Sequence, residues 1–422
     1  MAIEQKTEDS SRVGDYWKEQ FAKNRADASL WTNNPIIAQH IYRLISDGSP
    51  QHWLPWFLND YLSPGVVFEK SLSVCCGDGM HEMVLANSGR VRFVRGFDIS
   101  EGAIAQARQT FQSAGIPPES YRLEVADANN LELEDTFDLI LSTGALHHVT
   151  NLEGLLTTLS KRLDAHGYFV VLEYVGPNRF QWTDAQIGVI NGILRQLDTR
   201  HLKDNARKEL SRPSVETMIA TDPSEAVRSE DVMRVLEEHF MIEYRRNFNG
   251  TVMHQLYPLL NDQLTTAGDR EFDNIVRLIL WMEDVLIREK VLSSDFVFAI
   301  CRPKNVSTSA GAVASHPREY RYVGFIDYYD GRNIAGWAAN VTGTDAPVTV
   351  EIYVDDQLQA TGTADGFRQD LKEAGYGDGR RGFNLALPEN AAPRPLSELR
   401  VAGSEQVLST RRAVAFGGTV QP

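Results

Sequence analysis

Hydrophobic and polar residues follow two different patterns along this chain, and the pattern changes near residue 304. Before that point, short apolar runs alternate with longer stretches whose apolar residues recur at helical spacing. After residue 317, the chain is a series of short alternating runs separated by Gly, Asp and Pro. We therefore expect an α/β region over 70–303, a polar linker over 304–317 and a β-sandwich over 318–422.

The first apolar run of the α/β region, SLSVCCGDG at 71–79, predicts a strand that ends in a tight turn. A helix is predicted at 80–86, where MHEMVLA follows the turn. Glycine lets the backbone bend sharply and lets a ligand approach closely, because it carries no β-carbon. A strand, a glycine turn and a helix in this order form the first half of a nucleotide-binding βα unit.

Two later strands carry an acidic residue at or just past the carboxyl end. Asp98 ends the strand predicted at 91–100, and from there a carboxylate accepts hydrogen bonds from both ribose hydroxyls of an adenosine. Ser100 is better placed than Asp98 to cap the helix that follows. Asp127 follows a third strand, where it could accept from an adenine amino group or simply form a turn.

Four further strands are predicted, and their alternation with helices implies a parallel sheet with helices on both faces. The fourth strand runs into a glycine and two histidines at the edge where ligands bind in open α/β sheets. These three residues are Gly144, His147 and His148. The four strands are expected at 137–149, 168–175, 240–248 and 295–303.

Helical segments are expected around the ligand-binding edge. Residues 1–69 hold four of the seven tryptophans and are predicted to form a helical lid. Two helical insertions, near 177–239 and 251–294, are expected to cap the substrate. Within the first insertion, Asp-Pro-Ser-Glu at 222–225 is typical of a helix N-terminus with a capping box. The best candidates for a ring that covers the cofactor are Tyr16, Trp17 and Trp31.

The motifs SVCCGDG, GFDIS, VADANNL and FDLILSTGALHHV resemble, in this order and spacing, motifs I to IV of the class I S-adenosylmethionine-dependent methyltransferases. The resemblance covers residues 70–175 and extends more loosely to Pro303. It implies a Rossmann-like fold, methyltransferase activity and S-adenosyl-L-methionine as cofactor. The cofactor-binding residues that it implies are Cys75, Cys76, Gly77, Asp78, Gly79, Asp98, Ile99, Asp127, Ala128 and Gly144.

A nicotinamide-dependent dehydrogenase would share the strand, the turn and the acid. Its third glycine would fall at Glu82, and a bulky carboxylate there would stop the helix from packing closely on its strand. The methyltransferase interpretation is therefore preferred. Two positions depart from the usual family pattern: Ser73 stands where an acid is usual, and Cys75 stands where glycine is usual.

A hydroxyl acceptor must lose its proton during methyl transfer, so a base is expected where strands four and five end. His147 and His148 follow the fourth strand and Glu173 ends the fifth. Adjacent side chains diverge, so at most one histidine should face the pocket, and His148 is preferred. A structural role stays open for each of the three, and Glu173 could instead pair with Arg179. Candidate acceptor-binding residues are Tyr174, Arg179, Arg228 and His254.

The composition limits which partners and which cellular compartment we expect. A formal net charge of −15 and a pI near 5.2 argue against nucleic acid, whose phosphates would be repelled. Three cysteines are too few for a disulfide framework or a zinc site, and no His-x-x-x-His spacing stands out, so no metal is expected. The polar start lacks the apolar core of a signal peptide, and the longest apolar run carries charges. We expect a cytoplasmic protein with no integral membrane segment.

Three functions stay open from the sequence. The leading one is O-methylation of a sugar of a bacterial surface glycan or its precursor, because residues 318–422 resemble a small β-domain attached to enzymes of surface-polysaccharide synthesis. The second is a methyltransferase for another small molecule, such as a quinone or a secondary metabolite. The third is a non-catalytic cofactor-binding scaffold of a glycan-assembly complex. The β-domain could also mediate homo-oligomerisation.

Overall fold

The computed structural model divides into two compact units, Met1–Ser307 and Thr308–Pro422. The division falls within the predicted linker at 304–317, of which only Lys304 is among the described residues. The structure describes residues 13–14, 16–17, 30–46, 48–206, 208–304, 322–330, 332–340, 347–354, 357–373, 376–387, 397–401 and 407–411.

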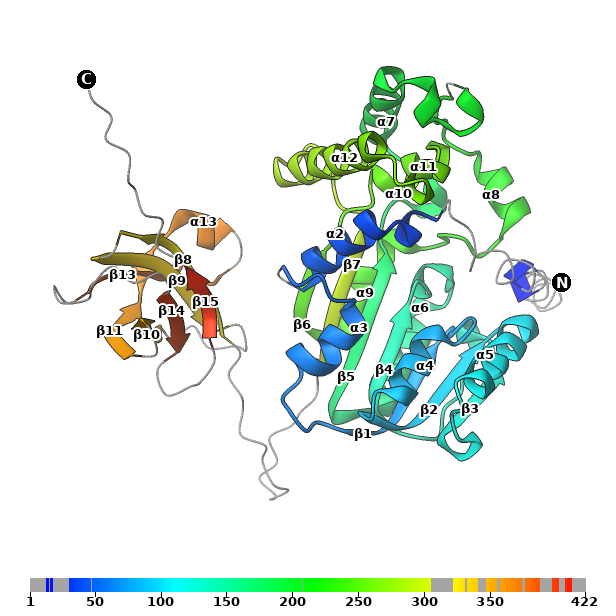
Figure 1. The fold of residues 1–422 in the computed structure, drawn as a ribbon. Coiled ribbons are helices and arrows are strands. Elements are labelled where there is room, and N and C mark those ends of the chain that lie inside the picture. The colour runs from blue at the N-terminus through cyan, green and yellow to red at the C-terminus, as the bar shows by residue number, and fades with distance from the viewer. Residues whose placement is uncertain are drawn as a thin grey trace. The chain divides into compact units, whose positions relative to one another are not determined.

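Seven strands form one sheet in the first unit, in the order β3-β2-β1-β4-β5-β7-β6 (Figure 1). The chain runs outward from β1 to β3 and then returns to β4, so the strand order reverses between β1 and β4. Ligands bind at the carboxyl ends of the strands where such a reversal occurs. The strands are β1 (Phe68–Val74), β2 (Val91–Asp98), β3 (Tyr121–Val125), β4 (Phe137–Thr143), β5 (Leu163–Tyr174), β6 (Phe240–Asn247) and β7 (Phe296–Pro303).

The sheet is mixed, so the prediction of a parallel sheet is wrong at one edge. Strands β1 to β5 pair in parallel, whereas β7 is antiparallel to both β5 and β6. The chain leaves β6 at its carboxyl end, forms helices there and returns directly as β7, without crossing a face of the sheet. A return of this kind requires antiparallel pairing.

Helices cover both faces of the sheet, as the sequence predicts. Leu139 and Leu141 of β4 face one apolar core, and Ile140 faces the other, because strand side chains alternate with a period of two. The first core packs against α2 (Pro35–Ile45), α3 (Trp53–Trp56), α4 (Met80–Asn87) and α5 (Glu101–Ser113). The second packs against α6 (Leu152–Arg162) and α9 (Val232–His239).

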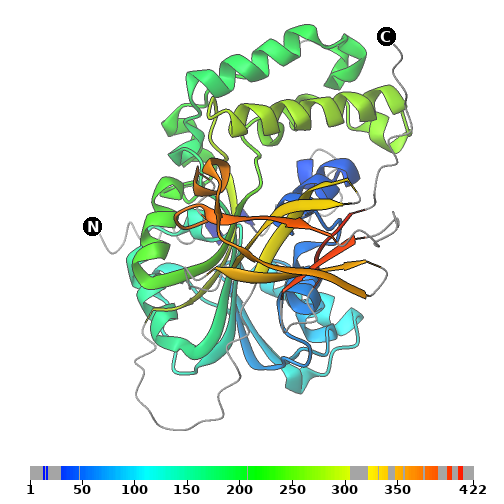
Figure 2. The same ribbon diagram turned by 90° about the vertical axis from the view of Figure 1, so that its left-hand side faces the viewer.

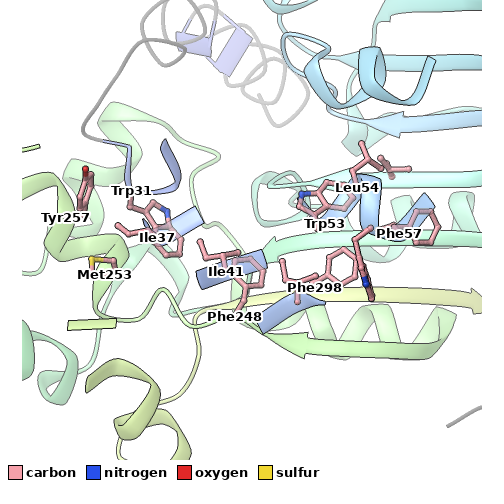
Figure 3. Close-up of a cluster of buried hydrophobic side chains, with 14 of the residues drawn as sticks. Trp31, Ile37, Ile41, Trp53, Leu54, Phe57, Phe248, Met253, Tyr257 and Phe298 are labelled. Carbon is pink, nitrogen blue, oxygen red and sulfur yellow. The ribbon is translucent and has the colours of Figure 1, made fainter. Parts of the chain in front are cut away.

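The N-terminal helices that the structure describes belong to the first core (Figure 3). Trp53 lies against Phe298 of β7, with 5.7 Å between ring centroids, and Trp56 is also buried. Trp31, a predicted lid residue, is 4% exposed and packs on Phe296. These rings stabilise the fold by burying apolar area.

Two groups of helices lie beyond the carboxyl ends of the strands (Figures 1 and 2), where the sequence predicts a cap. One group joins β5 to β6: η6 (Asn178–Phe180), α7 (Asp184–Gln196), η7 (Thr199–His201), η8 (Lys203–Asn205), α8 (Val215–Thr221) and η9 (Ser229–Asp231). The other joins β6 to β7: α10 (Met253–Leu256), η10 (Tyr257–Leu259), α11 (Gln263–Thr266) and α12 (Arg270–Arg288). Among the described helices, none has the length and apolar character needed to span a bilayer.

Short 3₁₀, π-helical and other turns complete the first unit. They are η1 (Trp31–Asn33), η2 (Phe57–Tyr61), η3 (Pro118–Ser120), η4 (Ala128–Asn130) and η5 (Leu146–His148). Of these, η4 and η5 follow β3 and β4 and so lie at the ligand-binding edge.

The second unit is a β-sandwich, as predicted. Two antiparallel four-stranded sheets, β11-β10-β14-β15 and β12-β13-β9-β8, enclose a core that includes Ile326, Ile334, Val350 and Leu399. The elements are β8 (Tyr322–Tyr329), β9 (Asn333–Asn340), β10 (Val348–Val354), β11 (Gln357–Ala364), β12 (Gly366–Phe367), α13 (Gln369–Glu373), β13 (Arg380–Ala386), β14 (Ser397–Val401) and β15 (Val407–Arg411).

Candidate active site

A cavity of about 520 Å³ opens at the carboxyl ends of β1, β2 and β4, where the strand order reverses. The side chains around it come from the glycine turn, from the ends of these strands, from η4 and η5, and from two segments far away in the sequence. Its lining is Val13, Trp17, Cys75, Cys76, Gly77, Asp78, His81, Asp98, Ile99, Asp127, Ala128, Asn129, Asn130, Thr143, Gly144, His148, Val149, Thr150, Asn151, Pro223 and Ser224. A second hollow, of about 790 Å³, includes Arg95 and Arg122 in its lining and shares none of these residues.

The turn after β1 has left-handed backbone at three residues, with φ of 50° at Cys75, 54° at Gly77 and 77° at Gly79. The conformation of Cys75 explains why glycine is usual there, since residues with a β-carbon rarely adopt it. At Gly79, an added β-carbon would lie 2.9 Å from the β-carbon of Ala107 in α5. Gly79 is therefore needed for the packing of α4 on α5.

The carboxylate that is usual at the end of β1 is supplied here by the neighbouring helix. Ser73 donates a hydrogen bond to Glu82 of α4, and both side chains are buried. Burial raises the pKa of Glu82 to about 7. The departure at Ser73 is thus matched by an acid nine residues later, beneath the turn.

Asp98 closes the turn from the adjacent strand and faces the cavity. One carboxylate oxygen accepts from the backbone N–H of Gly77 at 3.0 Å, and the other accepts from the N–H of Ser100 at 2.9 Å. Burial raises the pKa of Asp98, and these N–H donors oppose that rise. A third backbone N–H, that of Ile99, also lowers the pKa of this carboxylate. Ser100 caps α5, as predicted.

Asp127 caps η4 and lines the cavity at the same time. Its carboxylate accepts from the backbone N–H of Asn129 at 2.8 Å and from the side-chain amide of Asn130 at 3.0 Å. Gly144 also lines the cavity, with φ of 61°, and a β-carbon there would project into open space. The cavity therefore combines a glycine turn with two carboxylates, those of Asp98 and Asp127, and this set of groups fits S-adenosyl-L-methionine.

The cavity is lined by thiols that do not ionise. Cys75 and Cys76 are free, and burial raises the pKa of both thiols well above its ordinary value. They act as small apolar groups at the cofactor turn, as the sequence predicts.

Glu173 is completely buried, and three of the four N–H groups that it accepts from belong to the loop after β4. One oxygen accepts from the backbone N–H groups of Ala145 and Leu146 at 2.9 and 2.6 Å. The other accepts from the N–H of Tyr174 at 2.8 Å and from Nδ1 of His147. This carboxylate holds the loop that carries the histidines, and it does not line the cavity.

His147 lies between two carboxylates. Its Nδ1 bonds to Glu173, and its Nε2 lies 3.5 Å from an oxygen of Glu225. Burial alone would lower the pKa of His147, but the charge and hydrogen bond of Glu173, together with Glu225, raise it to about 10. At neutral pH this ring is a cation and has no lone pair with which to accept a proton.

His148 lines the cavity beside Trp17, whose ring centroid lies 5.2 Å away. Its Nδ1 bonds to the hydroxyl of Ser224 at 3.1 Å. Burial, and then the charge of His147, lower the pKa of His148. At neutral pH this ring is therefore neutral, so one nitrogen can accept a proton.

Residues 222–225 do not begin a helix, so the predicted capping box is wrong. Asp222 instead accepts from the N–H and the hydroxyl of Ser224, at 2.8 and 2.7 Å, in a tight turn. This turn brings Glu225 to the two histidines, which lower its pKa to about 2 although burial opposes ionisation. Sequence reasoning missed these functional candidates, because the same four letters also satisfy a local capping rule.

The predicted acceptor-binding residues are less exposed to the cavity than expected, and none of them is in its lining. Tyr174 is 2% exposed and donates to the carbonyl of Pro177, and Arg179 donates to the carbonyl of Glu225. His254 packs among aromatic rings, and burial lowers its pKa to about 4. Arg228 forms ion pairs with Glu153 at 2.7 Å and with Asp231 at 3.0 Å.

One grouping resembles a metal site. His147, His148 and Glu225 each bring a nitrogen or oxygen to within 4.8 Å of the others. The sequence could not reveal this, because Glu225 comes from a distant turn. A metal takes a neutral imidazole, so a metal at this position would have to displace the proton of His147 that Glu173 and Glu225 stabilise.

Part of this chain is similar to proteins of a known family. Residues 69–239 match the family model described as "Methyltransferase domain". An uncharacterised methyltransferase of Mycobacterium tuberculosis is 32% identical over 108 residues, which are 25% of this chain and 51% of that protein. One of Synechocystis is 30% identical over 131 residues, 31% of this chain and 56% of that protein. The chain spans about half the length of these curated relatives.

Solved structures show weaker likenesses. An S-adenosylmethionine-dependent methyltransferase of Mesorhizobium loti is 20% identical, with a TM-score of 0.35, and the match covers 61% of this chain and 99% of that one. The N-methyltransferase NodS of Bradyrhizobium japonicum, in complex with S-adenosyl-L-homocysteine, is 14% identical, with a TM-score of 0.36 and coverage of 68% and 99%. Scores at this level carry no inference about substrates. The family model thus makes residues 69–239 similar to methyltransferase domains.

Proposed function

We propose that this chain is an S-adenosylmethionine-dependent methyltransferase that acts on a hydroxyl group of a small molecule. The observation that carries the proposal is the position of His148. Its neutral ring lines the same cavity as Asp98 and the glycine turn, in a domain of methyltransferase type. A base beside the cofactor cavity is what a hydroxyl acceptor needs, because an alcohol is hardly ionised at neutral pH.

The residues from Cys75 to Gly79, with Gly144, would hold the methionine end of the cofactor. Asp98 would accept from the ribose hydroxyls, and Ile99, Asp127 and Ala128 would surround the adenine. When bound, the cofactor supplies a methyl group on a positively charged sulfur. Transfer is an in-line displacement, so the main task of the chain is to hold the acceptor oxygen against that methyl group. Trp17 packs on His148 and would exclude water from this position.

His148 is proposed as the general base, and its Nε2 as the atom that takes the hydroxyl proton. His147 is unsuited to the role because it is already protonated at neutral pH. Glu173 is unsuited because its oxygens accept from four N–H groups. We propose that these two residues position the loop that carries His148.

For the acceptor, we propose a sugar hydroxyl of a surface glycan or its precursor, with the β-sandwich as the unit that engages the glycan or a partner. The support is the resemblance of the C-terminal region to β-domains of polysaccharide-synthesis enzymes. The buried thiols, which remain free, fit a reducing cytoplasm as the setting.

Two experiments test the proposal in order. Calorimetric titration with S-adenosyl-L-methionine tests the cofactor, and absence of binding would refute the function. Mass spectrometry of products from an acceptor library then tests the acceptor class. Methylated saccharides are expected, whereas methylated phenols or quinones would move the enzyme to another small-molecule class. Binding without turnover on any acceptor would leave the scaffold interpretation.

A further inference from the structure

A chain of hydrogen bonds connects His148 to a buried carboxylate. The hydroxyl of Ser224 lies 2.7 Å from one oxygen of Asp222 and 3.1 Å from Nδ1 of His148. A carboxylate can only accept, so the single proton of the hydroxyl goes to Asp222. Ser224 must then accept from His148, and Nδ1 of His148 carries the hydrogen.

This direction decides which nitrogen of His148 can act as a base. In a neutral imidazole one nitrogen donates and the other accepts. With the hydrogen on Nδ1, the lone pair is on Nε2. The three residues lie at one edge of the cofactor cavity, where both His148 and Ser224 belong to the lining.

The second carboxylate oxygen of Asp222 is not engaged by Ser224. This oxygen, Oδ2, is buried, has no hydrogen-bond partner among the residues that the structure describes, and lies 4.0 Å from Nδ1 of His148. A buried carboxylate oxygen without a donor is costly, so its retention needs a reason. The reason that fits is a charge that forms only during turnover, namely the imidazolium of His148.

Several charged groups surround the position where that cation forms. The ring of His147, itself a cation, lies 4.1 Å from the ring of His148 between centroids, and its charge opposes protonation. Anionic groups must offset this, since like charges so close disfavour each other. The charged groups that act on His148 are His147, Glu173, Asp222 and Glu225. Burial, and then the charges of Asp222 and Glu225, raise the pKa of the Tyr16 phenol.

We propose that Asp222, acting through Ser224, is a positioning residue that holds His148 in the Nδ1–H form and stabilises its cation. The hydrogen-bond geometry alone gives the tautomer of His148. The role of Asp222 in turnover rests on the proposed function. During turnover, Nε2 of His148 would take the proton that the acceptor oxygen loses as this oxygen bonds to the methyl carbon. The bond between that carbon and the cofactor's sulfur would break, with its electron pair staying on the sulfur. The proton then passes to solvent when the product leaves.

The first test needs no acceptor and no activity measurement. Nitrogen-15 correlation spectra of the full-length wild-type protein at pH 7.5 report which ring nitrogen of each histidine carries hydrogen. The His148 signals are assigned as those missing in His148→Gln. We expect hydrogen on Nδ1 and a lone pair on Nε2. Hydrogen on Nε2 in the wild type would overturn the proposal.

Two variants separate the effect of the His148 tautomer from the effect of the Asp222 charge. In Ser224→Ala the link is gone, so His148 should lose the Nδ1–H form and turnover should fall about 10- to 100-fold at every pH. In Asp222→Asn the N–H of Ser224 still holds the side-chain oxygen, so the tautomer should persist while the charge is lost. The acidic limb of turnover should then move about one pH unit lower. Asp184→Asn, at a fully exposed carboxylate of the same cap, is the matched control and should match the wild type.

These experiments distinguish a failure of this proposal from a failure of the proposed function. If the wild-type protein binds no S-adenosyl-L-methionine, the function fails, and the tautomer is still read from the spectra. If turnover occurs but Asp222→Asn leaves the pH profile unchanged, the proposed role of Asp222 is wrong. Cofactor affinity of each variant, measured by calorimetry, confirms folding, and loss of fold in one variant leaves the other and the wild-type spectra to decide.

Discussion

The rings of His147 and His148 lie 4.1 Å apart between centroids and carry opposite pKa shifts. Glu173 bonds to Nδ1 of His147 and stabilises its cation, whereas Nδ1 of His148 bonds to the neutral hydroxyl of Ser224. The first cation then suppresses a second one beside it. Two adjacent residues of the same type therefore have different tasks, because different side chains reach each ring.

His148→Ala should lower turnover about 10²–10⁴-fold and leave cofactor affinity within about twofold, because a general base acts on the chemical step and not on binding. Single-turnover kinetics and calorimetry measure the two quantities. His166→Ala, at an exposed histidine of β5, is the control. Wild-type rates in His148→Ala with the true acceptor would mean that the acceptor needs no base.

Turnover of the wild type should be flat near neutral pH and fall on acidification below about 6.5, the ordinary histidine value. The pKa of His148 is lowered by burial and by His147, so the limb lies on the acidic side of that value. Turnover against pH at saturating substrates checks this. A limb above pH 7 would contradict the assignment of a neutral His148.

Stability should fall in alkaline solution because of His147. Its pKa is raised to about 10, so its contribution is complete below the unfolded value of about 6.5 and is lost as pH rises through about 10. The loss over this interval is on the order of 3–5 kcal/mol. Urea unfolding at pH 7 and pH 10 measures it. In His147→Gln the difference between the two pH values should shrink, and an unchanged difference would refute the paired cation.

Asp98→Asn should weaken cofactor binding about 30- to 1000-fold, because charge-assisted bonds to the ribose worth about 2–4 kcal/mol are lost. The amide keeps an oxygen that can hold the turn at Gly77 or Ser100, so the fold should survive. Calorimetry and thermal unfolding check the two statements. Wild-type affinity in the folded variant would remove Asp98 from the ribose site.

Gly79→Ala should lower stability, apart from any effect on the cofactor. The new β-carbon would meet Ala107 at 2.9 Å, and the φ of 77° is strained for any residue with a side chain. We expect a loss of about 1–3 kcal/mol in the free energy of unfolding. Ala107→Gly in the same chain should recover part of this loss. No recovery would mean that backbone strain accounts for the whole effect.

A chain that ends at Val306 should fold and bind cofactor with affinity within about twofold of full length, because the two units are separately compact. Calorimetry of the truncated protein tests this. Insolubility together with loss of binding would show that the units share a core.

Local pattern was enough to predict the seven strands, the glycine turn and the acids that follow β1, β2 and β3. Each of these features depends on residues close in sequence: a two-residue period gives a strand, and a glycine after it gives a turn. The position of Asp98 at a strand end placed it at the cavity edge, and the structure has it there. The β-sandwich was also predictable, because alternation and turn residues repeat through it.

The roles of the histidines were decided only by tertiary structure. From sequence, His147, His148 and Glu173 were three candidate bases, and 222–225 was a helix start. Folding brings that segment back to the cavity, where Ser224 reaches His148 and Glu225 reaches His147. Whether a histidine is a cation or a base depends on the groups within a few ångströms, and these come from Glu173, 26 residues from His147, and from the 222–225 segment, with Ser224 76 residues from His148.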